Sequence, residues 1–84
     1  MPEHHVLSPL PGTFYRRPAP EAPAFAEVGQ TVASGAVIGL VEVMKQFNEL
    51  VADADGVIRA FLVDNEGIVE PGQTVAIIDV SAQD

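Results

Sequence analysis

The sequence contains no cysteine and no tryptophan. Without cysteine the chain can form neither a disulfide nor a thiolate metal site, so packing has to supply its stability. It also lacks any apolar run that approaches the roughly 20 residues of a membrane-spanning helix. No basic segment followed by an apolar segment opens the chain, as it would in a secretory signal. These absences predict a cytoplasmic protein with no membrane partner.

Basic residues are scarce. Four basic residues stand against twelve acidic ones, which gives a formal net charge of −8 at pH 7. Such a surface repels phosphate backbones and anionic lipids, so no nucleic acid is expected as a partner. His4 and His5 are adjacent histidines without a third ligand nearby, and we predict no metal site. No paired carboxylates and no Ser/His/Asp set indicate a catalytic centre, so the sequence predicts no catalytic residues and no enzyme.

Among the few basic residues there is one lysine, Lys45. A chain with one ε-amine has one side chain at which a covalent amide can form. Composition alone leaves a second interpretation open, because most lysines are solvated surface charges.

The chain has 84 residues, enough for one small domain. We expect that domain to span residues 6–80, with flexible ends at residues 1–5 and 81–84. Its apolar runs are short, rich in β-branched and aromatic residues, and bounded by turn signals such as Pro11-Gly12 and Asp55-Gly56, which favours an all-β fold. The runs are Val6-Leu7, Thr13–Tyr15, Val57–Val63 and Val75–Val80.

The sequence also repeats itself. The pattern that begins at Val32 and includes Gly35 and Ile38 returns 37 residues later at Val69, with Gly72 and Val75 in the matching places. Gly12 and Gly56 extend the match at a different offset. Two similar halves predict a sandwich with pseudo-twofold symmetry, in which neither half alone can bury a core.

Residues 40–51 favour no single structure. Most of their apolar side chains follow the i, i+3, i+4 spacing of an amphipathic helix, and no Gly or Pro interrupts them. The repeat favours a strand instead, because its second copy at residues 75–80 is rich in β-branched residues. The residues alone therefore leave helix and strand–turn–strand open, with a slight preference for the second.

A proline-rich segment spans residues 17–24 and lies well inside the chain. Its three prolines exclude a helix and a central strand, so we predict a stiff loop. The loop is either a plain connector or a protrusion that contacts something else. Its residues are Arg17, Pro18, Ala19, Pro20, Glu21, Ala22, Pro23 and Ala24.

Several motifs together resemble the biotinyl domains of the carrier proteins of bacterial acetyl-CoA carboxylases, within the biotinyl/lipoyl domain family. The likeness covers roughly residues 6–80. It is carried by Ser8-Pro9-Leu10-Pro11-Gly12-Thr13-Phe14-Tyr15-Arg16, by Phe25-x-Glu27-Val28-Gly29-Gln30-x-Val32-x-x-Gly35, by Val41-Glu42-Val43-Met44-Lys45, and by Asn48-Glu49, Ala52-Asp53-x-x-Gly56 and Val69-Glu70.

The resemblance implies a flattened β-sandwich, or barrel-sandwich hybrid, of two four-stranded antiparallel sheets. It places Met44-Lys45 at the tip of a tight hairpin, which favours strand–turn–strand over helix. Residues 17–24 fall where acetyl-CoA carboxylase carriers have a protruding thumb near the biotin, and other biotinyl and lipoyl domains generally lack this insertion.

The resemblance also implies a function. Lys45 would carry covalent biotin, attached by a biotin protein ligase and flanked by Glu42, Val43, Met44 and Gln46. The domain would then shuttle carboxybiotin between biotin carboxylase and carboxyltransferase in fatty acid biosynthesis, as a carrier without catalysis of its own. A lipoyl carrier and an unmodified binding or assembly module are the alternatives.

Two residues depart from the family pattern of Ala-Met-Lys-Met. Val43 replaces the alanine, and Gln46 replaces the second methionine. A β-branched valine suits the end of a strand. Gln46 puts a polar amide beside the lysine, so this departure bears on modification and carboxylation rather than on the sandwich.

Overall fold

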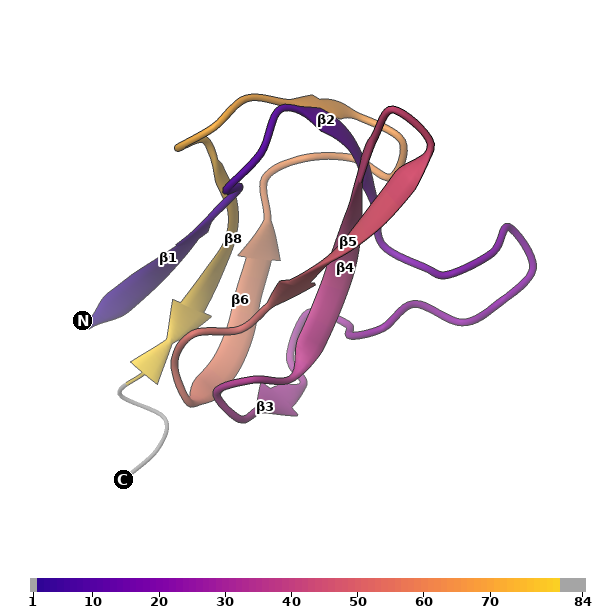
Figure 1. Ribbon diagram of the computed structural model, residues 1–84. Coiled ribbons are helices and arrows are strands. Elements are labelled where there is room, and N and C mark those ends of the chain that lie inside the picture. The colour runs from indigo at the N-terminus through magenta and orange to yellow at the C-terminus, as the bar shows by residue number, and fades with distance from the viewer. Residues whose placement is uncertain (1, 81–84) are drawn as a thin grey trace.

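The computed structural model describes residues 2–80, which form eight β-strands and no α-helix (Figure 1). No helix long and apolar enough to cross a bilayer therefore occurs in this part of the chain. The strands are β1 (Glu3–Leu7), β2 (Gly12–Tyr15), β3 (Thr31–Val32), β4 (Val37–Val43), β5 (Gln46–Val51), β6 (Gly56–Phe61), β7 (Ile68–Val69) and β8 (Thr74–Asp79).

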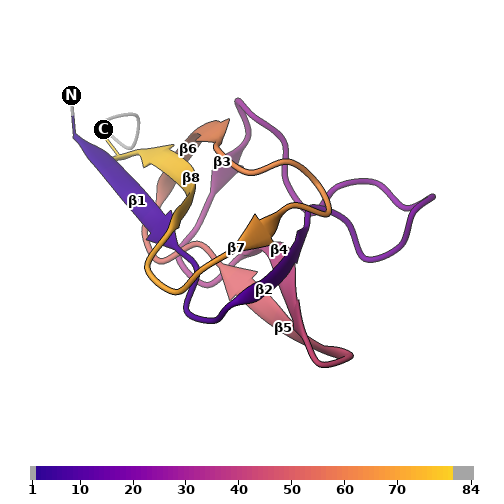
Figure 2. The same cartoon turned by 90° about the horizontal axis from the view of Figure 1, so that it is seen from above.

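The strands form two four-stranded sheets, with the orders β1-β8-β6-β3 and β5-β4-β2-β7. Every paired neighbour is antiparallel. Figures 1 and 2 show β1, β8 and β6 on one side and β2, β4 and β5 on the other. The predicted sandwich of two antiparallel sheets is confirmed.

The internal repeat is confirmed as a structural repeat. The first four strands correspond in order to the last four, and this correspondence converts one sheet order into the other. Val32 and Val69 are both buried, and Gly35 and Gly72 have φ angles of 96° and 84°. Positive φ is cheap only for glycine, so both copies use the same residue for the same turn.

The core lies between the sheets. The strands mostly alternate more buried with more exposed side chains, because successive residues point to opposite faces, and β4 and β8 each interrupt the alternation with two consecutive buried residues. Full burial of one such side chain contributes on the order of 1.5–3 kcal/mol. The largest fully buried apolar side chains are Phe14, Ile38, Ile58, Ile78, Val6, Val41, Val69 and Val75.

β2 and β4 pack closely beside the end of β4 that leads to Lys45. A Cβ atom added at Gly12 would overlap the backbone oxygen of Glu42, so only glycine allows this approach. Gly56, the matching glycine of the second half, meets the backbone oxygen of Asp79 in the same way. The close approach holds the strand that leads to Lys45 firmly against the sandwich.

The first strand begins at Glu3, earlier than the expected domain start at residue 6. His4 and His5 pair with β8, and His4 Nε2 lies 2.5 Å from Asp53 Oδ1. Polarity suggested a frayed end, but an edge strand with one solvated face tolerates polar residues. Among the described residues, no group of three or more His, Asp or Glu is placed to hold a metal ion. The expected flexible segment at residues 81–84 lies outside the described residues.

Residues 40–51 form part of the β4–β5 hairpin rather than a helix. The alternation of the strands decides the outcome: Val41 and Leu50 are buried, whereas Phe47 is 59% exposed. Helical spacing would have placed Phe47 with the buried side chains. β4 pairs antiparallel with both β5 and β2, and this pairing makes the segment a hairpin. The hydrophobic periodicity of residues 40–51 carries no information on such pairing.

Candidate functional site

Met44 and Lys45 are the two residues of the turn between β4 and β5. Their φ angles are 51° and 69°, so both lie in the left-handed region. A two-residue hairpin turn of type I′ needs positive φ at both positions and usually contains Asn-Gly. Side chains with a Cβ cost roughly 1–2 kcal/mol each in this conformation. The turn therefore holds two residues that its own backbone geometry disfavours.

The tip is open to solvent. Met44 is 93% exposed, and Lys45 is exposed as well. Within residues 2–80, no hydrogen bond or ion pair engages the Lys45 ammonium group. An enzyme that approaches the tip can reach this amine without breaking an interaction of the chain.

The base of the hairpin is fixed. Val43 packs against the core cluster and pairs with Gln46 across the turn. Asn48 Nδ2 donates to the backbone oxygens of Val41 at 3.3 Å and Gln46 at 3.4 Å. These contacts tie both strands together below the tip, so Lys45 projects from an ordered frame.

Glu42 lies on the outward face of the hairpin, because its neighbour Val41 points into the core. The Tyr15 hydroxyl donates to Glu42 Oε1 at 2.9 Å. This hydrogen bond to the carboxylate is the main cause that raises the pKa of Tyr15 above 10.0, with desolvation and the charges of Glu42 and Glu66 adding to it. The Tyr15 ring also faces the ring of Phe47, with centroids 5.9 Å apart.

The proline-rich segment forms a thumb, here defined as residues 17–24, that stands away from the sandwich (Figures 1 and 2). Its base is closed by a hydrogen bond from Phe25 N to Arg16 O at 2.9 Å. The Arg16 guanidinium lies 4.3 Å from the centroid of the Phe61 ring and bonds Glu27 at 3.1 Å. Arg16 therefore fixes the point from which the thumb leaves β2.

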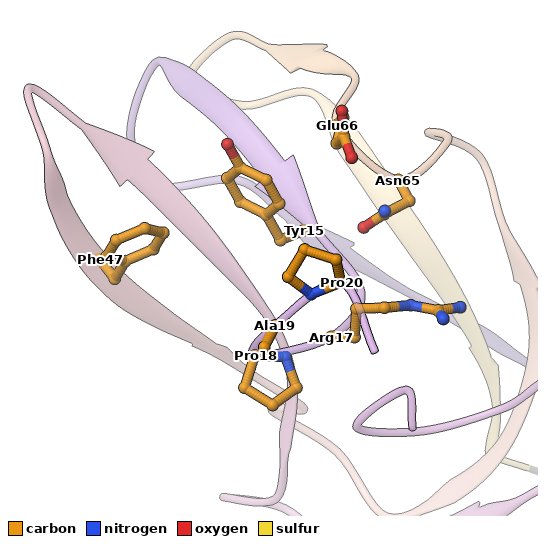
Figure 3. A pocket seen from close by; sticks show the side chains of 8 residues that line it. All are labelled: Tyr15, Arg17, Pro18, Ala19, Pro20, Phe47, Asn65 and Glu66. Atoms are coloured by element: carbon orange, nitrogen blue, oxygen red, sulfur yellow. The ribbon is translucent and has the colours of Figure 1, made fainter. Parts of the chain in front are cut away.

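A cavity of about 150 Å³ separates the thumb from the hairpin (Figure 3). The first half of the thumb forms one wall, and Tyr15 and Phe47 form the other. The second half of the thumb, Glu21, Ala22, Pro23 and Ala24, takes no part in the lining. The lining residues are Tyr15, Arg17, Pro18, Ala19, Pro20, Phe47, Asn65 and Glu66.

A second and wider hollow of about 420 Å³ lies on the other face of the hairpin. Gln46 lines it, because successive residues of β5 point to opposite faces and Phe47 points toward the thumb. The residues expected around Lys45 therefore divide between two faces. Glu42 faces the Tyr15 side, whereas Leu10, Val43, Met44, Gln46 and Asn48 line the second hollow.

Sequence reasoning did not find four residues of the thumb cavity: Tyr15, Phe47, Asn65 and Glu66. Strand alternation contained a signal for Phe47, since a strand that buries Leu50 must turn Phe47 to solvent. Asn65 and Glu66 form a turn just before Gly67. The position of this turn beside the thumb depends on long-range strand pairing, which the local sequence does not show.

A family model described as "Biotin-requiring enzyme" matches residues 4–78, nearly the whole chain. The chain belongs to this family.

Relatives in the biotin-requiring family include biotin carboxyl carrier proteins of acetyl-CoA carboxylase. The protein of this name from Haemophilus influenzae is 46% identical over 76 residues, which cover 90% of this chain and 49% of the relative. That from Streptococcus pyogenes is 46% identical over 68 residues, which cover 81% of this chain and 41% of the relative. The chain thus spans about half the length of the relatives it matches.

The fold of this family member also matches a solved structure, the urea carboxylase of Kluyveromyces lactis. The TM-score is 0.79 at 26% sequence identity, over 94% of this chain and 6% of the carboxylase chain. The same sandwich therefore occurs as a small part of a much larger protein.

Proposed function

We propose that the chain is a biotin carrier of an acyl-CoA carboxylase of the acetyl-CoA carboxylase type, with biotin attached through an amide to Lys45 Nζ. The observation that carries the proposal is the exposed turn that presents Lys45, the single lysine of the chain, with its amine free of partners in residues 2–80. Membership in the biotin-requiring family and the names of the relatives support it.

The residues around the tip fit such a group. An amide at Nζ removes the charge of Lys45 and breaks no interaction within the described chain. Beside the hairpin, the thumb cavity offers apolar walls from Pro18, Pro20 and Phe47, and a polar side chain from Asn65. An aliphatic arm that ends in a small polar ring matches this combination of surfaces.

The chain contributes to the chemistry by presenting the Lys45 amine to other enzymes. The Lys45 amine has to lose a proton and attack an activated acyl group, which a biotin protein ligase supplies. Biotin, once bound, carries a carboxyl group between the active sites of a biotin carboxylase and a carboxyltransferase. The ordered hairpin keeps the attachment point at a fixed position, and the covalent tether keeps the group at high effective concentration. In this role the chain makes and breaks no bonds of the carboxylation itself and serves fatty acid biosynthesis.

The proposal is tested by intact mass after incubation with biotin, ATP and a bacterial biotin ligase. We expect one biotinyl addition on the native chain and none on Lys45→Arg. A matched control separates position from mere availability of an amine: Lys45→Arg combined with Arg59→Lys moves the single lysine to exposed β6. This double variant should stay unmodified. An unmodified native chain, or a lipoyl addition in cells, would exclude the biotin carrier.

Gln46 provides a second arm of the same experiment. Its side chain is exposed on the face away from the thumb, so Gln46→Met leaves the core and the thumb cavity intact. We expect this variant, which restores the family's Met-Lys-Met, to be modified or carboxylated faster than the native chain. Equal rates would show that the amide at position 46 imposes no penalty.

A further inference from the structure

Tyr15 occupies the junction between the two parts of the site. Its ring lines the thumb cavity and faces Phe47 at 5.9 Å between centroids. Its hydroxyl reaches out of this cavity to Glu42 Oε1 at 2.9 Å. In Figure 3 the hydroxyl points away from the thumb prolines, toward the upper end of the hairpin. One side chain thus contacts both the cavity and a carboxylate on the strand that leads to Lys45.

The Glu42 carboxylate accepts a hydrogen bond through only one of its two oxygens in the described chain. Oε1 accepts from Tyr15, and Oε2 accepts no hydrogen bond from any described residue. Glu42 also pairs in register with Phe47 across the hairpin, so the two side chains share the outward face. A carboxylate fixed through one oxygen presents the other oxygen in a defined direction.

Glu42 stands three residues before Lys45 in the chain. Glu42 is on the outward face of β4, on the strand that ends at the tip. An enzyme that reaches Nζ has to cover the tip and the strand ends below it. Glu49, the other charged side chain on the outward face of the hairpin, is also acidic, and the chain carries a net charge of −8. The complementary surface is therefore cationic.

We propose that Tyr15 is a positioning residue for the acylation of Lys45: its hydroxyl holds Glu42 so that Oε2 receives a cationic hydrogen-bond donor of the acylating enzyme. This inference rests on the proposed function, since it names a contact of the ligase that would modify the chain. It assigns Tyr15 no contact with the reacting atoms.

The Tyr15 hydroxyl can be removed by substitution while the fold is kept. The side chain is half-buried on the outward face of β2, next to the fully buried Phe14. Tyr15→Phe keeps the ring, its contact with Phe47 and the wall of the cavity. It removes only the donor that fixes Glu42, so the variant should still fold cooperatively and lose only the small stabilisation that this one hydrogen bond contributes.

Steady-state biotinylation by a purified bacterial biotin ligase tests the inference. A lost hydrogen bond that only orients a docking group should raise KM for the carrier about three- to tenfold and leave kcat unchanged. Glu42→Gln should raise KM at least as much. In the double variant, Tyr15→Phe should add nothing to Glu42→Gln, because Tyr15 acts through that carboxylate.

Thr74→Val is the matched control, since it removes a hydroxyl that bonds His5 Nδ1 at 3.3 Å in the other sheet. It should leave KM unchanged. A Tyr15→Phe variant with native KM, or effects that add in the double variant, would overturn the inference while the native chain still takes up biotin. A native chain that takes up no biotin would overturn the proposed function and the inference together.

Discussion

Tyr15 and Glu42 lie 27 positions apart, and antiparallel pairing of β2 with β4 brings their side chains within hydrogen-bond distance. At the scale of single residues, the site depends on such long-range neighbours. The sequence predicts Lys45 and Glu42 through a local motif, because the motif is contiguous. It does not predict Tyr15 or Phe47 as their companions, because their side chains meet only after the strands have paired.

The ionisation of Tyr15 gives a prediction at this scale. The chain has one tyrosine and no tryptophan, so near-ultraviolet phenolate absorbance reports Tyr15 alone. The hydrogen bond to Glu42 raises its pKa above 10.0 in the folded chain. A raised pKa favours the protonated phenol, so this interaction stabilises the fold fully below pH 10.0 and the stabilisation is lost as the pH rises through the raised pKa.

We therefore expect the absorbance midpoint of the native chain to lie above pH 10.0 and to fall in Glu42→Gln. Glu49→Gln removes a carboxylate that is exposed on β5 and serves as the control with an unchanged midpoint. Equal midpoints in the native chain and in Glu42→Gln would contradict the hydrogen bond as the cause.

At the scale of elements, the hairpin and the thumb differ in how far the sequence predicts them. Three prolines in residues 17–24 exclude regular structure by covalent geometry alone, so the loop is predictable. The β4–β5 hairpin is not, because Met44-Lys45 lacks the residues that normally announce its turn. The internal repeat and the family resemblance, rather than local propensity, indicated the strands.

The strain of the turn gives a prediction for this element. Asn adopts the left-handed region at low cost and is favoured at the first position of a type I′ turn. Met44 is 93% exposed and loses almost no packing when it is replaced. We expect Met44→Asn to raise the free energy of unfolding by about 0.5–1 kcal/mol, since it relieves part of the left-handed penalty. Urea denaturation measures the change.

Met44→Ala is the control for this experiment. Alanine keeps the Cβ that causes the strain, so its free energy of unfolding should stay near that of the native chain. If Met44→Asn were no more stable than Met44→Ala, the φ angle of Met44 would not limit the stability of the hairpin.

At the scale of the whole molecule, the two halves interlock. Each sheet contains two strands from the first half and two from the second. The repeat in the sequence predicts two similar halves and a shared core. The order of the strands within each sheet does not follow from it, because separate stacked halves would satisfy the same pattern.

Interlocking predicts that neither half folds alone. A cut between Met44 and Lys45 crosses an exposed turn and removes no core residue. Fragments 1–44 and 45–84 each lose half of both sheets, and chains of about 40 residues without disulfide or metal rarely bury enough surface to fold. Circular dichroism should show no cooperative thermal transition for either fragment. A cooperative transition in one fragment would mean that its half forms an independent core.

The two ends of the described chain lie next to each other, on the side of the sandwich opposite the hairpin tip. Val80 N donates to Pro2 O at 3.3 Å, and β1 runs beside β8. In both overall views these ends lie far from the β4–β5 tip (Figures 1 and 2). A sensor surface or a fluorescent label joined at either end would therefore leave the lysine facing the bulk solution, and the orientation of an immobilised sample would not depend on which end is used.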